Sequence, residues 1–221
     1  MKRILYDLAA ADDGLRFSPY CWRVKLALAH KNLPFETIVW RFTEKDEIAF
    51  SGQGKVPVLI DGERIVSDSQ EIAEYLEGAY PNEASLFGEP PSRALTRFIK
   101  AWTEDGLHPR IARVVLPDIF PQLAARDQAY FRETRERAWG MSIEAMAATR
   151  DEHIPAFKAA LAPLRTTLAA QSFIAGSAPA YADHIVFGAL QWARLMSSTN
   201  LLESEAGILA WMEAVLATYG L

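Results

Sequence analysis

The pattern of apolar residues changes near residue 80, and this change limits the folds available to the chain. Before that point, runs typical of strands alternate with runs typical of helices, in the order strand, helix, strand, helix, strand, strand, helix. The strand-like runs are Lys2–Leu8, Phe35–Trp40, Pro57–Ile60 and Arg64–Val66. Almost no strand pattern follows residue 91. We therefore expect an α/β domain over residues 1–80, a linker over 81–91 and an all-helical domain over 92–221.

Local signals place the helices and turns of the first part. The expected helices are Pro19–Lys31, Thr43–Phe50 and Asp68–Ala79. Thr43 fits the N-cap of the second helix, with Asp46 in its first turn. Asp61-Gly62, between the last two strand-like runs, is typical of a hairpin turn. The segment Tyr80–Pro91 contains three prolines and marks the domain boundary.

Helical patterns dominate the second part. The runs are Ser92–Leu107, Gln122–Arg150, Ile154–Ala170, Tyr181–Met196 and Glu205–Tyr219. Three prolines, Pro109, Pro117 and Pro121, are expected to interrupt the stretch after the first run. Pro155 fits the first turn of the third run. Tyr181–Met196 is mostly apolar, which is typical of a buried helix.

The composition excludes several classes of protein. Half of the 221 residues are apolar, 23% are charged and the formal net charge is −5, as in a globular protein. No basic stripe is present, which disfavours nucleic acid as a partner. One cysteine and four scattered histidines give no expectation of a disulfide framework or of a bound metal. No apolar run reaches transmembrane length, and the first residues do not fit a signal peptide. We therefore expect a cytoplasmic protein with no membrane partner.

The segment Phe17–Lys25 (FSPYCWRVK) carries the first candidate for chemistry. Ser18 precedes Pro19, and proline is a preferred first residue of a helix, so Ser18 fits the N-cap. Backbone N–H groups and the helix dipole favour an anion at this position. Two interpretations stay open: Ser18 caps the helix only, or its hydroxyl also meets a bound anion.

The segment Gly54–Leu59 (GKVPVL) places a proline at the start of an apolar strand. A proline there lacks a donor for the strand ladder and marks an edge or a special turn. A cis peptide at Val56–Pro57 would expose the backbone groups of Val56 to a ligand. An ordinary edge proline explains the same pattern, and Lys55 fits a solvated surface lysine equally well.

The tetrapeptide Ser67–Gln70 (SDSQ) precedes a helical run and is rich in capping residues. Ser67 and Gln70 fit a capping box, which explains the segment without any ligand. In the alternative interpretation, the exposed N–H groups and the Ser69 hydroxyl hold a ligand carboxylate, and Asp68 holds a ligand ammonium group. Later in the chain, Asp183 in the first turn of an expected helix is interpreted as a structural residue that stabilises the helix dipole.

Four stretches, taken together and in this order, resemble the cytosolic glutathione S-transferase family: FSPYCWRVKLAL, GKVPVLIDG, SDSQEIAEYL and YADHIVFGAL. The resemblance extends over nearly the whole chain. It implies a thioredoxin-like N-terminal domain, an all-helical C-terminal domain and a homodimer. It also implies a detoxification enzyme that binds glutathione as co-substrate, needs no metal, and directs the glutathione thiolate at a hydrophobic electrophile.

The resemblance assigns roles to five residues of the first domain. Ser18 takes the place of the catalytic serine of serine-type members. Val56, before a cis Pro57, resembles the residue whose backbone pairs with the cysteinyl unit of glutathione. Asp68 and Ser69 match the acidic residue and serine that hold the γ-glutamyl end. In this view the Ser18 hydroxyl donates to sulfur, which favours the thiolate over a thiol of pKa near 8.5.

Further assignments concern the glycine end of glutathione and the helical domain. Lys55 matches a position that often meets the glycine carboxylate. Arg41 is a second candidate for that role, although the loop before it aligns poorly. Asp183 matches the final residue of the family's helix-capping box, whose cap position is Ala180 here instead of Ser or Thr. A missing cap predicts a loss of local stability of about 1 kcal/mol without an effect on activity.

Two residues compete with Ser18 for the role of hydrogen-bond donor to sulfur or for thiol chemistry. Tyr6 lies on the first expected strand, where some family branches use a tyrosine, but it also fits a half-buried strand aromatic. Cys21 follows Ser18 by three residues, in the second-cysteine position of a Cys-x-x-Cys motif. With serine in the first position, thiol–disulfide exchange is disfavoured. Cys21 is interpreted as a packed helix residue, with a mixed disulfide to glutathione as the alternative.

The pocket for the second substrate is expected between the two domains. Four residues are candidates by position: Tyr20, Trp102, His108 and Arg113. Trp102 also fits core packing, and His108 and Arg113 lie near the prolines, where solvent exposure is expected. Four other tryptophans fit core packing: Trp22, Trp139, Trp192 and Trp211.

The resemblance leaves the reaction open. The phrases FSPYCW and YADHIVFGALQWAR are most similar to the bacterial and fungal β-etherase-like branch, which implies cleavage of aryl ethers by thiolate attack. The maleylacetoacetate-isomerase-like branch carries a similar Ser-x-x-x-Trp-Arg pattern. Its diacid substrate would need extra cations in the pocket, such as Arg113 or Arg194. A third alternative is a binding or scaffold protein that has kept the fold without turnover.

Overall fold

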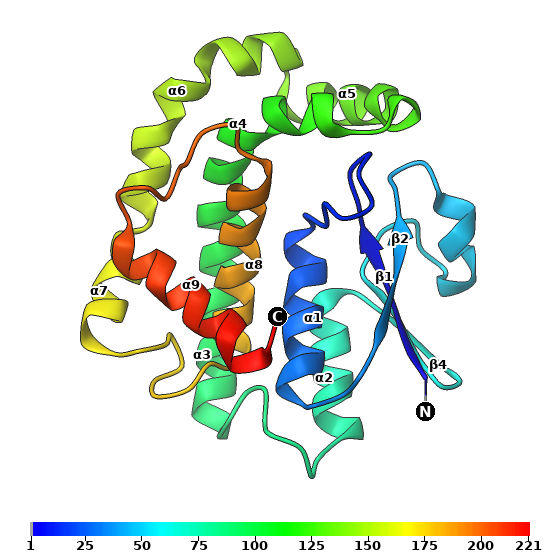
Figure 1. Ribbon diagram of the computed structural model, residues 1–221, viewed down its shortest axis with the longest axis vertical. Coiled ribbons are helices and arrows are strands. Elements are labelled where there is room, and N and C mark those ends of the chain that lie inside the picture. Colours follow the sequence, from blue (N-terminus) through cyan, green and yellow to red (C-terminus); the bar gives the residue numbers. More distant parts are fainter. Residues whose placement is uncertain (1) are drawn as a thin grey trace.

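The computed structural model describes residues 2–221, and the first part of the chain folds around a four-stranded sheet (Figure 1). Its elements are β1 (Arg3–Leu8), α1 (Pro19–His30), β2 (Glu36–Trp40), the 3₁₀ helix η1 (Lys45–Ser51), β3 (Val58–Asp61), β4 (Arg64–Ser67) and α2 (Ser69–Ala79). The strand order is β2-β1-β3-β4. Strand β1 pairs in parallel with β2 and antiparallel with β3, and β3 pairs antiparallel with β4. The predicted thioredoxin-like α/β domain is confirmed.

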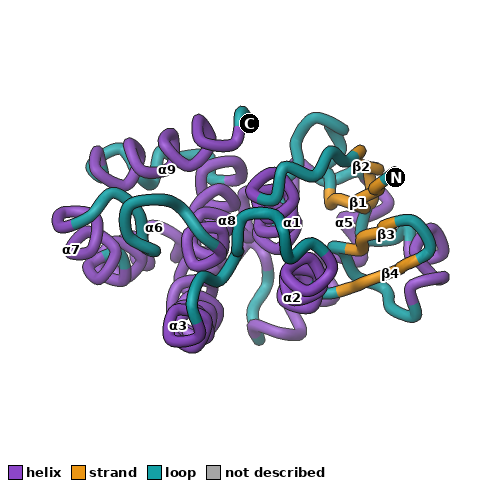
Figure 2. Tube along the Cα trace, turned by 90° about the horizontal axis from the view of Figure 1, so that it is seen from below, coloured by secondary structure: helices purple, strands orange, loops and turns teal. Residues whose placement is uncertain are grey.

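Helices α1 and α2 lie between the sheet and the rest of the chain (Figure 2). Leu5 of β1 and Leu59 of β3 are paired on adjacent strands, and both are fully buried. They share a hydrophobic core with Ile72 of α2. Tyr181 and Ile185 belong to the same core, although they come from the second half of the chain. The helical part therefore completes the core of the sheet domain.

The second part is helical, as predicted. Its elements are α3 (Pro90–Ala101), the π-helical segment η2 (Trp102–Leu107), α4 (His108–Ile119), the 3₁₀ turn η3 (Phe120–Gln122), α5 (Ala125–Trp139), α6 (Ile143–Ala160), α7 (Ala162–Ala170), α8 (Tyr181–Met196) and α9 (Ala206–Tyr219). Helix α8 is almost entirely buried and packs against α1, α4 and α9 (Figures 1 and 2). Within residues 2–221, none of the helices combines the length and the apolar character that crossing a membrane would require.

A glycine brings α8 unusually close to the start of α1. A Cβ atom placed on Gly188 would lie 2.3 Å from the carbonyl oxygen of Pro19 and 3.4 Å from Cγ of Arg23. No side chain other than hydrogen fits this distance. Since Pro19 directly follows Ser18, the contact between α8 and α1 fixes the position of Ser18 relative to the helical part.

The stretch after α3 differs from the prediction at Pro109 and Pro117, which do not interrupt it, whereas α4 does end just before Pro121, in the turn η3. The π-helical turn η2 joins α3 and α4 into one continuous rod. Pro109 lies in the first turn of α4, directly after the wider π-helical turn. Proline has no backbone N–H to donate, and this position tolerates the missing donor. Pro117 lies inside α4 near its end. Arg113, whose carbonyl loses its helical partner at Pro117, is exposed to solvent.

The N-cap predicted at Thr43 is wrong. Helix η1 starts two residues later, and Glu44 occupies the flanking position. The backbone N–H and the hydroxyl of Thr43 instead both donate to Oδ1 of Asp127, at 2.9 and 2.8 Å. Thr43 therefore tethers the loop after β2 to helix α5.

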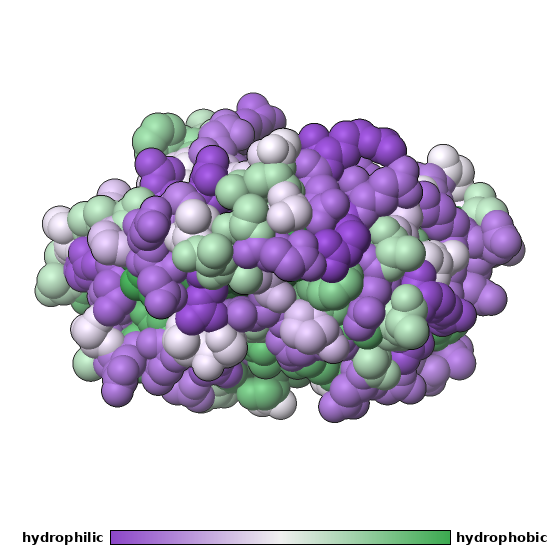
Figure 3. All heavy atoms as spheres, turned by 90° about the horizontal axis from the view of Figure 1, so that it is seen from above, coloured by the Kyte–Doolittle hydropathy of each residue, from purple (hydrophilic) through white to green (hydrophobic). Residues whose placement is uncertain are grey.

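The two long runs expected over residues 122–150 and 154–170 are divided differently in the structure. Gly140, with φ of +68°, ends α5 in the left-handed conformation, and Ser142 caps the start of α6 through a bond from the N–H of Ala145. Helix α6 then continues to Ala160, so Pro155 lies inside it and not in a first turn. The face that carries α5 and α6 is mainly hydrophilic, with apolar side chains in small groups (Figure 3).

Candidate functional site

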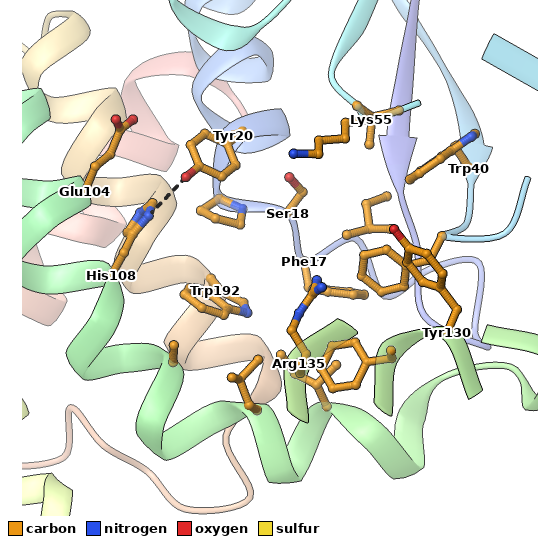
Figure 4. Close-up of a pocket in the computed structure, with 18 of the residues that line it drawn as sticks. Phe17, Ser18, Tyr20, Trp40, Lys55, Glu104, His108, Tyr130, Arg135 and Trp192 are labelled. Carbon is orange, nitrogen blue, oxygen red and sulfur yellow. Dashed lines mark hydrogen bonds between the residues drawn. The ribbon is translucent and has the colours of Figure 1, made fainter. Parts of the chain in front are cut away.

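A cavity of about 490 Å³ lies between the sheet domain and the helical part (Figure 4). The sheet domain contributes Leu8, Phe17, Ser18, Pro19, Tyr20, Trp40, Phe42, Gly54, Lys55 and Val56. The helical part contributes Glu104, His108, Pro109, Ala112, Leu116, Ile119, Tyr130, Phe131, Arg135, Trp139 and Trp192. The lining is mostly aromatic and aliphatic, with few charged groups. Such a site suits an apolar molecule that is oriented by a few polar contacts.

Ser18 occupies the N-cap of α1, as predicted, and faces this cavity (Figure 4). Its backbone is extended, and its Oγ accepts a hydrogen bond of 3.2 Å from the N–H of Cys21. A serine hydroxyl can accept and donate at the same time. Because the cap uses only the acceptor, the hydroxyl proton of Ser18 remains able to point at a group in the cavity.

Cys21 and Tyr6 lie away from the cavity surface. Cys21 is fully buried, and burial, reinforced by the nearby carboxylate of Asp7, raises the pKa of its thiol. Its Sγ lies 3.9 Å from the carbonyl oxygen of Tyr6. The ring of Tyr6 packs against Phe50, with 5.6 Å between the ring centres. Neither side chain lines the cavity that Ser18 faces.

Lys55 and Val56 line the cavity on the side of the sheet domain. The Val56–Pro57 peptide is cis, as predicted. The Lys55 side chain is directed into the cavity that Ser18 also lines (Figure 4). No carboxylate of the described residues forms an ion pair with Lys55, so a cationic group is available at this wall.

Asp68 and Ser69 lie where β4 meets α2, outside the cavity lining. Asp68 caps α2, and its Oδ1 accepts from the N–H groups of Gln70 and Glu71 at 2.7 and 3.2 Å. Its φ of +72° lies in the left-handed region, which costs a non-glycine residue energy. The carbonyl of Ser69 accepts a 2.7 Å bond from the hydroxyl of Tyr181, so α8 also fixes this turn.

The structure separates three expected residues from the cavity. Arg41 donates to the carbonyl of Ala10 at 3.1 Å and pairs with Asp13, which ties down its own loop. Trp102 packs against the main hydrophobic core. Arg113 stacks on Trp139 at 4.9 Å, beside a second and much smaller pocket.

The other two expected residues, Tyr20 and His108, do line the cavity, and His108 is buried instead of solvated. Nδ1 of His108 lies 3.4 Å from the Tyr20 hydroxyl, and Nε2 lies 3.5 Å from Nη2 of Arg23. Burial, followed by the positive charge of Arg23, lowers the pKa of His108 to about 3, so the ring is neutral near neutral pH.

These contacts assign the hydrogen-bond direction. A guanidinium only donates, so Nε2 of His108 accepts from Arg23 and Nδ1 carries the proton. The Tyr20 oxygen then accepts from His108, and the Tyr20 proton is left to point at a molecule in the cavity. Arg23 is itself fixed by Glu104, whose Oε1 lies 2.6 Å from Nη1.

Sequence reasoning missed most of the helical wall. Glu104, Tyr130 and Arg135 carry no local motif, and they line one cavity only because η2 and α5 converge on the sheet domain. Trp139 and Trp192 pack against the main core, as expected, and they also line the cavity, which was not expected. The one local signal for Tyr130 and Arg135 was the placement of aromatic and basic residues within a charged helix.

The carboxylate of Asp183 accepts four hydrogen bonds inside the helical part. It is fully buried and accepts from the N–H groups of Ile174, Ala175 and Ala180 and from the indole N–H of Trp211, at 2.7 to 3.1 Å. The bond from Ala180 is the half of a capping box that does not need a hydroxyl at the cap. Asp183 thus joins α8, α9 and the loop between α7 and α8.

Comparison with known proteins agrees with this architecture. The chain aligns with the fungal glutathione transferase GSTFuA3 of Phanerochaete chrysosporium with a TM-score of 0.88 and 23% identity, over 99% of this chain and 97% of that one. It also aligns with a glutathione S-transferase of Ceriporiopsis subvermispora, solved in complex with glutathione, with a TM-score of 0.85 and 23% identity, over 100% and 98% of the two chains.

Two curated relatives are similar over part of their length. A probable glutathione S-transferase of Oryza sativa subsp. japonica is 31% identical over 104 residues, which are 43% of this chain and 44% of the relative. A stringent starvation protein A homolog of Haemophilus influenzae is 29% identical over 114 residues, 51% of this chain and 52% of the relative. The chain thus matches about half or less of each relative's length.

Sequence models of two protein domains match the chain and cover most of it. The N-terminal domain of glutathione S-transferases matches residues 14–84. The C-terminal domain of the same enzymes matches residues 94–219. With the sheet topology, the helical part and the cavity between them, these matches show that the chain belongs to the glutathione S-transferase family.

Proposed function

We propose that this protein is a serine-type glutathione transferase, in which Ser18 stabilises the thiolate of glutathione. The observation that carries the proposal is the position of the Ser18 hydroxyl, which lines the cavity and caps α1 as an acceptor, so that its proton can be directed at a bound molecule. A donor to sulfur and a helix N-terminus both favour the thiolate over the thiol. Ser18 is a hydrogen-bond donor in this role and not a nucleophile, so it needs no catalytic base.

The remaining residues of the sheet domain would hold the tripeptide. The backbone of Val56 pairs with the cysteinyl unit, and Asp68 with Ser69 holds the γ-glutamyl end. Lys55 faces the glycine carboxylate, for which its unpaired cation is suited. Arg41 has no part in this proposal, because its guanidinium is bound to its own loop.

The second substrate would occupy the aromatic part of the cavity, next to the thiolate. Attack forms a carbon–sulfur bond, the leaving group departs with the electron pair of the bond that breaks, and the thiol proton has gone to solvent on binding. Holding both reactants together supplies much of the rate enhancement. Tyr20, held by His108, can donate its proton to an oxygen of the electrophile. Such a donor suits an aryl ether, whose leaving oxygen gains negative charge, and this favours the etherase-like branch.

The lining of the cavity also bears on the two alternative functions, an isomerase and a scaffold protein. Isomerisation of a diacid needs cations in the pocket; the two arginines named for it, Arg113 and Arg194, do not line the cavity, whereas Lys55 and Arg135 do. A scaffold protein without turnover remains the alternative from another class, since one curated relative is named for stringent starvation and not as a transferase. The open Ser18 hydroxyl favours the enzyme. We further propose a cytoplasmic homodimer, in keeping with the family resemblance and with exposed apolar side chains such as Phe50 and Ile65.

Calorimetric titration of glutathione tests the proposal. The titration uses wild type and Ser18→Ala in two buffers of different ionisation enthalpy, because the difference between buffers reports protons released on binding. We expect release of close to one proton by wild type and much less by Ser18→Ala at the same pH. Equal proton release by both proteins would remove Ser18 from this role, and no binding by wild type would make the scaffold the leading interpretation.

A further inference from the structure

Arg135 is a cation in the aromatic part of the cavity. It comes from α5, and its side chain lines the same cavity as Phe17 and Ser18 (Figure 4). The guanidinium carbon lies 4.9 Å from the ring centre of Phe131 and 5.5 Å from that of Phe42. Its hydrogen bond within the described residues is a 3.0 Å contact from Nη1 to the hydroxyl of Thr134. Most of the donor capacity of a guanidinium is thus open to the cavity.

Other arginines of α5 form ion pairs with glutamates, and Arg135 differs from them in this respect. On the same helix, Arg132 pairs with Glu136 and Glu144, and Arg137 pairs with Glu133. Within residues 2–221, no carboxylate pairs with Arg135. Burial lowers the pKa of its guanidinium, yet an arginine stays charged at neutral pH.

The acidic group of the cavity is already engaged. Glu104 lies 2.6 Å from Nη1 of Arg23 and 2.6 Å from Nζ of Lys100, so its charge is balanced without Arg135. A partly buried cation without an anionic partner loses solvation that nothing else replaces in full. The faces of Phe42 and Phe131 compensate in part by cation–π attraction, typically by about 0.5–2 kcal/mol.

We propose that Arg135 binds a carboxylate or a similar oxyanion on an aromatic second substrate. The inference rests on the proposed function and narrows its substrate class to planar aromatic electrophiles that carry a negative charge. Aromatic walls suit the ring, and the fork of the guanidinium suits a carboxylate in two-point contact. Lys55, on the opposite domain, leaves the glycine carboxylate of glutathione with a cation of its own.

A binding experiment tests Arg135 without any reaction. Calorimetry compares 2-naphthoate with 2-naphthamide, which have the same shape and differ in charge, on wild type, Arg135→Gln and Arg137→Gln. We expect wild type to bind the carboxylate about tenfold more tightly than the amide, as for a charge-assisted hydrogen bond. The preference disappears in Arg135→Gln and persists in Arg137→Gln, whose arginine is exposed on the same helix. Arg135→Lys, which keeps the charge, is expected to retain part of the preference.

A kinetic experiment connects the site with turnover. The substrates are 4-chloro-3-nitrobenzoate and its methyl ester, with glutathione, and the quantity is the ratio of their kcat/KM values. We expect this ratio to fall about tenfold in Arg135→Gln and to stay unchanged in Arg137→Gln. If wild type converts neither substrate, the proposed function fails for these electrophiles, while the naphthoate comparison still decides the role of Arg135.

Two outcomes overturn the inference. The first is an equal preference for naphthoate in wild type and in both Arg135 variants, which would mean that the aromatic faces alone satisfy the cation. The second is a glutathione Kd that rises about tenfold in Arg135→Gln with an unchanged naphthoate preference. In that case the carboxylate that Arg135 meets belongs to glutathione and not to the second substrate.

Discussion

Helices α1 and α8 each carry a polar side chain at their N-terminus, Ser18 at the N-cap of α1 and Asp183 in the first turn of α8, and the protein uses the hydrogen-bonding capacity of the two to different extents. Asp183 in the first turn of α8 is buried and accepts four hydrogen bonds from the protein. Ser18 at the start of α1 accepts one bond, from the N–H of Cys21, and faces a cavity. In sequence both residues look like ordinary helix-start residues.

The difference shows what separates a structural polar group from a candidate functional one. Residue type and position at a helix start do not decide it. What decides it is hydrogen-bonding capacity that the fold leaves open toward a cavity. Asp68 at the start of α2 is intermediate, since it is exposed and accepts two backbone bonds on one oxygen only.

The largest effect is expected at Asp183, whose hydrogen-bonding capacity is used by the protein itself. Asp183→Ala leaves three backbone N–H groups and the indole N–H of Trp211 without an acceptor, so we expect a loss of about 3–5 kcal/mol in the free energy of unfolding. Urea unfolding followed by circular dichroism measures this loss. Asp68→Ala is the matched control, with an expected loss of about 1 kcal/mol for an exposed cap. Equal losses would erase the distinction between the two helix starts.

Ser18→Ala tests the other residue of the comparison, whose hydroxyl faces the cavity. If the proposed function holds, turnover of a chloronitroarene with glutathione falls by about 10²-fold, as when one preorganised donor to a developing anion is removed. Ser142→Ala is the control, because Ser142 also caps a helix through one backbone bond but lies outside the cavity lining. Both variants are expected to lose about 1 kcal/mol of stability, and only Ser18→Ala is expected to lose turnover. A similar loss of turnover in both would reduce Ser18 to a cap.

Gly188→Ala tests the contact between the middle of α8 and the start of α1. The new methyl group would meet the carbonyl of Pro19, so either α1 or α8 must shift, at a cost of about 1–3 kcal/mol. Because Ser18 precedes Pro19, we expect turnover to fall together with stability. Gly78→Ala in α2 has open space around the new methyl group and is expected to raise stability by about 0.5–1 kcal/mol. Retained stability in Gly188→Ala would show that the close approach is easily relaxed.

The smallest effect concerns acid. In the unfolded chain a histidine titrates near 6.5, whereas the pKa of folded His108 is about 3. Between these values the unfolded state binds more protons, so the stability contributed by neutral His108 is lost as pH falls from about 6.5 to about 3. From pH 7.5 to 5.5 this amounts to about 1 kcal/mol. His184 in α8, whose pKa burial also lowers, adds to the same loss.

His108→Gln separates the two histidines. Urea unfolding at pH 7.5 and 5.5 should show a smaller decrease in the free energy of unfolding for His108→Gln than for wild type, by about 1 kcal/mol. An identical decrease in both proteins would assign the acid sensitivity to the buried histidines around α8 and leave the cavity histidine without a part in it.

Much of the fold could be predicted because its signals are local. Helix α8 was predicted with its observed limits, since a run of apolar residues follows an acidic first turn. The interruption expected at Pro109 and Pro117 is wrong: Pro109 lies in the first turn of α4, directly after a π-helical turn, and Arg113, four residues before Pro117, is exposed to solvent. The break at Gly140 was missed, although a glycine at a helix end followed by a capping serine is the usual signal for it.

The candidate site divides in the same way. Ser18, Lys55 and Val56 belong to short segments whose turn chemistry can be recognised in sequence. Arg135 and Trp192 come from helices that are far apart in the chain and meet only after packing. Arg41 was misplaced because a loop brings its guanidinium back to Ala10 and Asp13. No local pattern encodes such contacts, so the helical wall could not be predicted.

The π-helical turn between α3 and α4 sets the rotation of an entire wall. An α-helix turns by about 100° for each residue, so one residue more or less before α4 rotates everything after it by that angle. Deleting one residue within Trp102–Leu107 would therefore turn His108, Ala112 and Leu116 away from the cavity while leaving each of them in a helix. In this rod, the shape of the chamber depends on a residue count, and chains that differ by one residue here would enclose differently lined chambers on the same scaffold.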